Sequence, residues 1–253
     1  SKEEYRQIYN KINNMDNRIN IHLKKNGGVS AARNYGLQFV TGKYVVYVDS
    51  DDKLLPNFFE EAYKIAEDEN ADIVLGCNIH MDKYTDDLTA MPLLDEDIIT
   101  LSGSDISKIR PNMVGDYLSF ENGKIYIGHG PWTRLIKRDI AVNTLFTEGL
   151  PICEDVIWNL QAIDKSSKIC YVKRAWYLYN LDNDNAVTKR FNNKTIEESK
   201  IGLEEIKKHL NFSIDAEYLA FALRCIKNLR GINKRYFCHK QFNLSKLKKR
   251  SIY

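Results

Sequence analysis

The chain has 253 residues, a hydrophobic content of 43% and a formal net charge of +3. This length suits one large domain, or one domain with an appendage, and the apolar content is ample for a core. No run of about 18 apolar residues occurs, and no apolar stretch follows Ser1, so the sequence predicts neither a membrane-spanning helix nor a signal peptide. We expect a cytoplasmic protein.

The five cysteines are scattered along the chain and none forms a Cys-x-x-Cys pair. Both a structural zinc site and a disulfide framework are disfavoured, because each requires regularly spaced or paired cysteines. We therefore expect thiols in a reducing cytosol.

The basic charge is concentrated at the end of the chain. Residues 232–253 contain seven Lys or Arg and no Asp or Glu, which leaves 30 basic and 34 acidic residues in the rest. Aromatic and aliphatic side chains interleave with these charges, as in segments that contact the inner face of an anionic membrane. Nucleic acid is the competing partner, and a solvated terminus that binds nothing is the third interpretation.

Helices and strands are predicted to alternate in the first eighty residues. Apolar spacing, caps and turn residues predict, in order, a helix over 2–14, a strand over 19–23, a turn at 26–28, a helix from a Ser30 cap to about Val40, a strand over 44–48, a helix from Pro56 to about Glu69, and a strand over 73–77. This order predicts an α/β fold with a mostly parallel sheet flanked by helices.

The rest of the sequence is regular only after residue 126. Residues 80–125 are rich in Asp, Ser and Asn and are interpreted as loops with short helical pieces. Periodicity then predicts a helix near 154–165, a strand near 168–172 and helices from 194 onward. We divide the chain into an α/β domain at 1–190 and a helical region with a basic tail at 191–253.

Three carboxylates follow the apolar run 44–48, namely Asp49, Asp51 and Asp52, with Ser50 between them. A run without polar alternation predicts an inner strand buried on both faces, and ligands bind beyond the carboxyl ends of such strands. Adjacent carboxylates repel one another unless a cation lies between them, and Mg²⁺ is typically held by one or two carboxylates plus substrate phosphates. The cluster predicts a metal–diphosphate site; a turn that caps the next helix is the alternative.

A glycine-rich turn, Asn26-Gly27-Gly28, precedes the predicted helix that carries Arg33 and Asn34. Backbone N–H groups at such a turn, together with the helix dipole, favour anions. A guanidinium at Arg33 is suited to clamp a phosphate. The alternative is a simple chain reversal, with Arg33 on a solvated face.

Glu154 and Asp155 begin a predicted helix. Carboxylates are electrostatically favourable at a helix N-terminus, so a structural role is one interpretation. The other is a general base that takes a proton from an attacking hydroxyl group.

The segment from His129 to Leu135 contains Trp132 and Arg134. Trp132 is suited either to the core or to a platform for a sugar ring. Arg134 is suited to face a diphosphate. Taken alone, the segment favours core packing.

Together these segments resemble family 2 of the inverting glycosyltransferases. Residues 26–57 match the family's Asn-x-Gly, Ala-Arg-Asn-x-Gly-Leu, Gly-x-Tyr, Asp-x-Asp-Asp and Pro-Asn. Residues 130–140 resemble its Pro-Trp-x-Lys/Arg-Leu segment, residues 146–160 its Glu-Asp segment, and Tyr177-x-Tyr179 its closing strand. The resemblance covers roughly residues 1–190, in consistent order, and is to bacterial capsule, wall-polymer and lipopolysaccharide enzymes.

The resemblance implies a GT-A-like fold and a nucleotide-diphospho-sugar donor, expected to be a UDP-sugar. It implies that Asp155, with Glu154 beside it, is the catalytic base, and that Mn²⁺ or Mg²⁺ is held by Asp51 and Asp49, with Asp49 toward the nucleoside ribose. Asp52 is then left to cap the next helix. The residues implied to lie near the nucleotide-sugar are Gly28, Arg33, Asn34, Asp49 and Ser50. Those implied to lie near the donor sugar or acceptor are Trp132, Arg134 and His129.

The sequence departs from the family in two places. The family's opening strand, helix, strand and Asp-Gly-Ser turn, which bind the nucleotide base, do not occur, so we expect a truncated chain or an incomplete donor pocket. Asn180 stands where the family usually has Arg. The processive members' Gln-x-x-Arg-Trp is also absent, which predicts addition of one sugar per encounter.

Two functions follow. The first is metal-dependent, inverting, non-processive transfer of a sugar to a hydroxyl group of a saccharide or lipid-linked acceptor in surface polysaccharide synthesis, with no nucleic acid partner. The second is a non-catalytic remnant or interaction module, or an inactive truncated fragment. A nucleotidyltransferase on a related sheet is disfavoured, because it would carry its own phosphate loop in the first strand–turn–helix.

Overall fold

The computed structural model describes residues 4–80, 97–114, 119–120, 123–124, 130–150, 152–180, 193–211 and 221. The helices of this part are α1 (Glu4–Asn13), α2 (Gly28–Gly36), α3 (Phe58–Asp68), α4 (Arg110–Val114), α5 (Arg138–Val142), α6 (Glu154–Asp164) and α7 (Asn193–Lys208), with 3-10 turns η1 (Leu37–Phe39) and η5 (Gly103–Ile109). The strands are β1 (Tyr44–Val45), β2 (Lys53–Leu54), β3 (Ile73–His80), β4 (Ile98–Ser102), β5 (Ser119–Phe120), β6 (Gly123–Lys124), β7 (Arg134–Lys137) and β8 (Lys168–Tyr179).

A six-stranded mixed sheet forms the centre, in the order β1–β7–β3–β8–β2, with β4 also paired to β8. Among the described strands only the β3–β8 ladder is parallel. The prediction of a mostly parallel sheet is therefore wrong for these strands. The physical reason is that buried apolar strands look alike in sequence, whereas strand direction depends on how the chain returns to the sheet.

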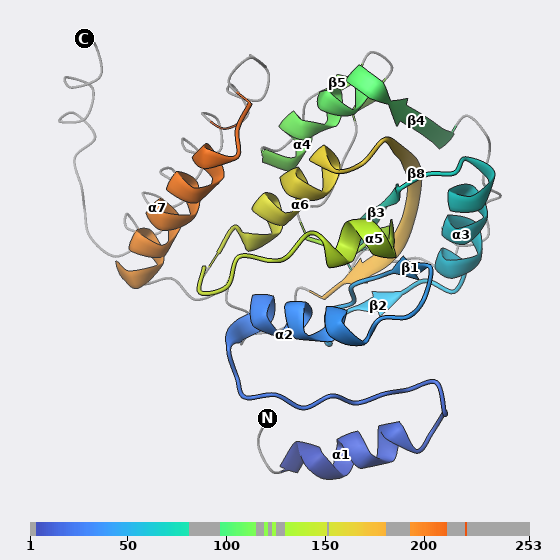
Figure 1. Ribbon diagram of the computed structural model, residues 1–253, viewed down its shortest axis with the longest axis vertical. Helices are drawn as coiled ribbons and strands as arrows, with labels where there is room; N and C mark the ends of the chain where they lie inside the picture. The colour runs from blue at the N-terminus through green and yellow to red at the C-terminus, as the bar shows by residue number, and fades with distance from the viewer. Residues whose placement is uncertain are drawn as a thin grey trace.

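Helices cover both faces of this sheet (Figure 1). On β3, Val74 faces the α3 side, whereas Ile73 and Leu75 face the side of α4, α5 and α6. This alternation is expected because successive side chains of a strand point to opposite faces. Both faces are apolar, so the strand reads as a continuous hydrophobic run.

The strand predicted over 19–23 is not formed, and Leu23 is 58% exposed. The run 44–48 forms only the two-residue strand β1, which lies at the edge of the described sheet and pairs with β7 alone. Val48 is 48% exposed, so the prediction of an inner strand buried on both faces is also wrong. In both cases the side chains suit a strand, but a strand also needs a partner along its whole length.

Other predicted elements are confirmed, with small changes at their ends. The helices over 2–14, 56–69 and 154–165 correspond to α1, α3 and α6, and the strands over 73–77 and 168–172 extend to become β3 and β8. The helix after the glycine turn begins at Gly28, so Ser30 lies buried inside it and does not cap it. Strand β4, within the region interpreted as loops, was not predicted.

Helix α7 packs beside α6 (Figure 1). Ile206 of α7, and Leu210 just after the end of α7, belong to the same hydrophobic cluster as Trp158. The boundary between 190 and 191 stays a prediction, as does the basic tail 232–253, which lies outside the described residues.

No helix in the described part of the chain is both long and apolar enough to cross a bilayer. None of the described cysteines forms a disulfide.

Candidate active site

Residues 49–52, called the acidic turn from here on, are tied to the end of β8. The Asp52 N–H donates to the Asp49 carbonyl at 3.1 Å, which closes the turn. The Tyr177 hydroxyl accepts from the Asp49 N–H at 3.1 Å and donates to Asp52 Oδ2 at 2.6 Å. The Asn180 N–H donates to Asp52 Oδ1 at 2.8 Å. Asp52 therefore does not cap the next helix, which begins at Phe58 after Asn57.

Arg33 of α2 reaches the acidic turn from the other side. Its Nη2 donates to Asp49 Oδ1 at 2.8 Å, and its Nη1 lies 3.7 Å from Glu154 Oε1. The Nη1 atom is buried and has no hydrogen-bond partner among the described residues. The Arg33 side chain is only 11% exposed, so it does not lie on a solvated face. One cation thus joins the Asp-x-Asp and Glu-Asp segments.

An aromatic cluster packs against the guanidinium of Arg33. The guanidinium lies over the Phe146 ring, 5.0 Å from its centroid, in a cation–π contact. Phe146 stacks on Trp158 at 5.0 Å, and Tyr47 meets both rings edge-on at 5.3 and 5.4 Å. The Trp158 indole N–H donates to the Thr144 carbonyl at 2.8 Å. These packed rings give the cation a fixed position.

Two of the three carboxylates are therefore stabilised by protein groups. Asp49 pairs with Arg33, and Asp52 accepts from Tyr177 and Asn180, so protein groups compensate part of the negative charge of the cluster. Burial, reinforced by the charges of Asp51 and Asp49, raises the pKa of Asp52. Asp51 and Ser50 are exposed. Within the residues that the structure describes, no three His, Cys, Asp or Glu side chains form a metal-binding group.

Glu154 and Asp155 begin α6, as predicted. The residue before them, Cys153, has φ 70°, a left-handed conformation that non-glycine residues adopt rarely and often at functional sites. Asp155 Oδ1 accepts from the Val156 N–H at 2.8 Å. Burial, and then the charge of Asp155, raises the pKa of Glu154 to about 7, although Arg33 opposes the shift. Glu154 therefore exchanges its proton near neutral pH.

We expect Glu154 to make stability depend on pH. Its folded pKa of about 7 exceeds the ordinary glutamate value of 4.5, so the folded state binds the proton more tightly. This contribution is complete below the unfolded pKa and is lost as pH rises through the folded one. At about 1.4 kcal/mol per pKa unit, we expect wild-type protein to lose roughly 2–3 kcal/mol relative to Glu154→Gln between about pH 5 and 8.

Denaturant unfolding of both proteins at several pH values in this range measures the difference. Glu60→Gln is the matched control, because Glu60 is exposed in the first turn of α3. Parallel pH profiles for wild-type protein and Glu154→Gln would contradict the expectation.

Arg134 is buried, in agreement with the core packing that its segment favours, and its assignment to a diphosphate stays a prediction. It is 1% exposed and donates to the carbonyls of Gly130 and Trp132, the latter at 2.8 Å, and to Met113 Sδ at 3.7 Å. Burial lowers the pKa of Arg134 to about 9, and the negative charge of Asp155 opposes that shift. Arg134 therefore places a buried positive charge near Asp155.

Trp132 lies flat against the end of β8. Its ring stacks on Tyr177 at 5.0 Å and 14°, and on Tyr179 at 5.5 Å and 30°. Trp132 is half-buried, and Thr133 after it has φ 65°, which is strained for a β-branched residue. His129, predicted to lie near the sugars, is outside the described residues.

Asn34 connects α2 to the segment before α6. Its Oδ1 accepts from the Phe146 N–H at 2.8 Å, and its Nδ2 donates to the Phe146 carbonyl at 2.9 Å and to Glu148 Oε1 at 3.0 Å. The structure thus gives Asn34 a positioning role that the sequence did not predict. Gly28 begins α2 with φ +85°, a conformation that favours glycine, and its N–H donates to Asn26 Oδ1 at 3.1 Å.

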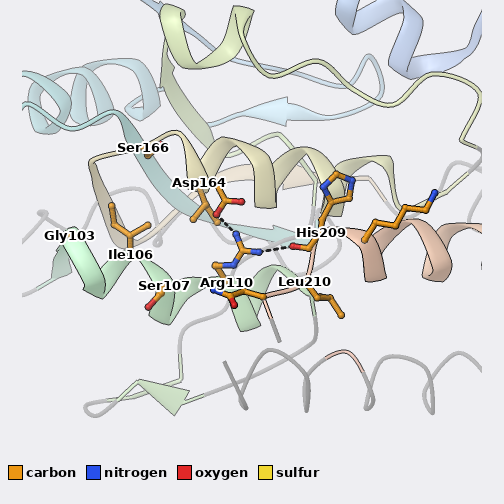
Figure 2. Close-up of a pocket in the computed structure, with 11 residues that line it drawn as sticks. Gly103, Ile106, Ser107, Arg110, Asp164, Ser166, His209 and Leu210 are labelled. Carbon is orange, nitrogen blue, oxygen red and sulfur yellow. Dashed lines mark hydrogen bonds and ion pairs between the residues drawn. The ribbon is translucent and has the colours of Figure 1, made fainter. Parts of the chain in front are cut away.

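A cavity of about 580 Å³ lies at the opposite end of α6 (Figure 2), between η5 and the end of α7. Arg110, 5% exposed, pairs there with Asp164 and donates to the His209 carbonyl at 2.8 Å. These contacts fasten α7 to the domain. Ten residues separate Glu154 from Asp164 on α6, which is about 15 Å at 1.5 Å per residue, so the cavity is separate from the candidate site.

The family model described as "Glycosyl transferase family 2" matches residues 1–130, just over half of the 253 residues. The chain belongs to this family. The membership predicted from the ordered motifs is thereby confirmed, and the matched residues include the acidic turn and Arg33.

Two curated relatives of the chain are bacterial proteins. The chain is 27% identical over 171 residues to a cholesterol galactosyltransferase of Borreliella burgdorferi, covering 68% of this chain and 47% of that protein. It is 27% identical over 215 residues to the minor teichoic acid biosynthesis protein GgaB of Bacillus subtilis, covering 82% of this chain and 21% of that one. The chain spans about half the length, or less, of these relatives.

Solved structures confirm the fold. The structure of S. aureus TarS 1–349 in complex with UDP-GlcNAc superposes with a TM-score of 0.55 at 18% identity, covering 81% of this chain and 55% of that one. The longer TarS structure gives a TM-score of 0.55 at 19% identity, covering 99% of this chain and 39% of that one. This likeness confirms the predicted GT-A-like α/β architecture.

Several residues of the site were not predicted as partners. Tyr177 was noted only as part of a closing strand, and Phe146 only as part of the Glu-Asp segment. Two signals were present: a strand of the predicted domain that ends in Tyr-x-Tyr, and an acidic turn with more carboxylates than two ligand roles require. Neither signal identifies which residues meet.

Proposed function

We propose that the protein is a glycosyltransferase that moves a sugar from a nucleotide-diphospho-sugar, a UDP-sugar in our view, to a hydroxyl group of a saccharide or lipid-linked acceptor in surface polysaccharide synthesis. The observation that carries the proposal is the meeting of two family segments at Arg33, which lies 2.8 Å from Asp49 and 3.7 Å from Glu154. Family membership and the names of the relatives support the reaction class.

We assign Asp51 and Asp49 to a Mn²⁺ or Mg²⁺ ion. Carboxylate oxygens are the ligands these ions prefer, and one or two of them suffice where substrate phosphates complete the shell. Asp51 is exposed and therefore accessible to an ion. We assign Asp49 two roles, as a second ligand of the ion and as a neighbour of the ribose. When bound, such an ion offsets negative charge on the leaving nucleoside diphosphate.

Arg33 is the donor we assign to a phosphate oxygen, because its buried Nη1 lacks a hydrogen-bond partner among the described residues. Gly28 begins α2, and the helix dipole favours an anion at this N-terminus. Asn34 supports this wall through Phe146. The exposed Ser50 lies on the acidic turn.

Asp155 is the residue we assign as general base. An oxygen–carbon bond forms as the acceptor oxygen attacks the anomeric carbon from the face opposite the diphosphate, and the carbon–oxygen bond to the diphosphate breaks with its electron pair. The acceptor proton passes to the Asp155 carboxylate. The result is inversion at the anomeric carbon, with one sugar added per encounter. Trp132 is suited to stack on a sugar ring.

Calorimetric titration with UDP and Mn²⁺ tests this proposal. We expect one saturating site, abolished by EDTA and weakened at least about tenfold by Arg33→Met, since a charged hydrogen bond contributes about 1.5–3 kcal/mol. Arg18→Met is the control, because Arg18 also pairs with an aspartate but is 86% exposed. No heat with the wild-type chain would favour the alternative, a non-catalytic module or an incomplete donor site.

Two further parts of the proposal concern location. Contact between the basic tail 232–253 and an anionic membrane is proposed from the charge pattern. A cytoplasmic location for the rest of the chain is proposed from its scattered, unpaired cysteines. The tail interleaves Lys and Arg with aromatic residues, which suits a lipid surface better than a base-reading groove.

A further inference from the structure

The Tyr177 hydroxyl occupies the centre of the contacts that hold the acidic turn. It accepts from the backbone of Asp49 and donates to the side chain of Asp52, at 3.1 and 2.6 Å. The turn is closed on itself by the Asp52 N–H and joined to β8 again by the Asn180 N–H. A single hydroxyl therefore contacts both the first and the last residue of the turn.

The position of this hydroxyl is defined by rigid neighbours. Tyr177 is fully buried, and its strand is paired on both sides, with Asn78 of β3 and Leu54 of β2 opposite Tyr177. Burial, and then the hydrogen bond to Asp52, raises the pKa of Tyr177 well above its ordinary value. The hydroxyl therefore keeps its proton, and the directions of its two hydrogen bonds are set.

The ring of Tyr177 holds the other side of the site. Trp132 stacks on it at 5.0 Å, nearly parallel at 14°. Trp132 in turn covers Gly130 so closely that a Cβ there would lie 2.1 Å from the indole. The segment carrying Trp132 is thus packed against the same tyrosine that holds the acidic turn.

We propose that Tyr177 is a positioning residue that holds the acidic turn through its hydroxyl and Trp132 through its ring, so that the two parts of the site form one unit. The exposed tip of the turn, Ser50 and Asp51, is thereby presented from a fixed base. The expected effect of Tyr177 on ligand binding rests on the proposed function. The expected effect of Tyr177 on the position of the acidic turn does not.

Tyr177→Phe separates positioning by the hydroxyl from packing by the ring, because phenylalanine keeps the ring. If Tyr177 acted only through its packing, this variant would leave the acidic turn unchanged. Only the two hydrogen bonds to the acidic turn are lost. Tyr171→Phe is the matched control: Tyr171 is buried on the same strand, and its hydroxyl contacts Cys77 Sγ at 3.2 Å, away from the turn. Both variants lose one buried hydroxyl.

Amide hydrogen exchange measured by NMR tests the positioning without any ligand. In Tyr177→Phe we expect the amides of Asp49, Asp52 and Asn180 to exchange at least about tenfold faster than in wild-type protein, while the core amides of β3 and β8 change little. In Tyr171→Phe these three amides keep their wild-type rates. Equal acceleration in both variants, or none in Tyr177→Phe, overturns the proposal.

Titration with UDP and Mn²⁺ then tests the link to the ligand. We expect Tyr177→Phe to weaken binding about tenfold and Tyr171→Phe to leave it unchanged. If exchange responds but the wild-type chain binds no UDP, the positioning holds and the proposed function fails. If exchange responds and UDP affinity is unchanged in Tyr177→Phe, Tyr177 holds the turn but the proposed link between the turn and ligand binding is overturned.

A second variant keeps the test decisive if Tyr177→Phe does not fold. Asp52→Asn presents one oxygen where the carboxylate presents two, so the bonds from Tyr177 and Asn180 cannot both be kept. We expect the Asp52 and Asn180 amides to exchange faster in this variant, with the core unchanged. Wild-type exchange at both amides overturns the proposal.

Discussion

Replacing Asp155 with Asn should lower the rate of sugar transfer by roughly 10²- to 10⁴-fold, the usual contribution of a general base. The amide has the same shape and retains an oxygen for the Val156 N–H, which Asp155 Oδ1 accepts at 2.8 Å. It cannot, however, take up the acceptor proton. The loss is therefore expected in kcat, with little change in KM for the donor.

Release of UDP from a UDP-sugar by the full-length protein provides the measurement. Asp139→Asn is the matched control, because Asp139 is an exposed carboxylate in the first turn of α5 and its loss changes a helix N-terminus in the same way. Transfer at an undiminished rate by Asp155→Asn would refute the assignment of the base, and an equal loss in Asp139→Asn would attribute the effect to helix stability.

Arg134→Met should produce the largest loss of stability, roughly 2–5 kcal/mol in the free energy of unfolding. The guanidinium is 1% exposed and supplies hydrogen bonds to the carbonyls of Gly130 and Trp132. Methionine fills similar volume but donates nothing, so two carbonyls lose these donors. The positive charge near Asp155 is lost as well.

Chemical denaturation at a single neutral pH measures this loss. Arg138→Met serves for comparison, since Arg138 lies four residues later, is exposed, and donates to the Thr41 carbonyl at 2.8 Å. We expect that control to change stability by about 0.5 kcal/mol or less. Similar stabilities for the two variants would show that the buried guanidinium is not a structural anchor of the site.

The elements that the sequence predicted well are those whose local pattern is strong enough to decide them. Helix α6 has a continuous apolar face, with Val156, Leu160 and Ile163 all buried. Strand β3 begins with the apolar run Ile73-Val74-Leu75, which predicts a buried strand. Residues 19–23, where the prediction failed, also alternate correctly, but none of the described strands pairs with them, and a strand exists only in a pair.

The site divides in the same way. The sequence could identify the acidic residues of the site, namely Asp49, Asp51, Glu154 and Asp155. Clustered carboxylates at the end of a strand or the start of a helix indicate ion binding or helix capping. The sequence could not identify the residues that these carboxylates contact. Tyr177 lies 125 residues after Asp52, and Asn34 lies 112 residues before Phe146. No local spacing links residues so far apart.

By itself the sequence determined the family, the α/β class and the chemical groups available at the site. Tertiary structure alone decided that Arg134 is buried beneath the site, that Arg33 joins Asp49 to Glu154, and that the acidic turn is held by Tyr177. The physical reason is that side-chain chemistry is carried by each residue. Burial, pairing and charge compensation, by contrast, depend on which distant segments the folded chain brings together.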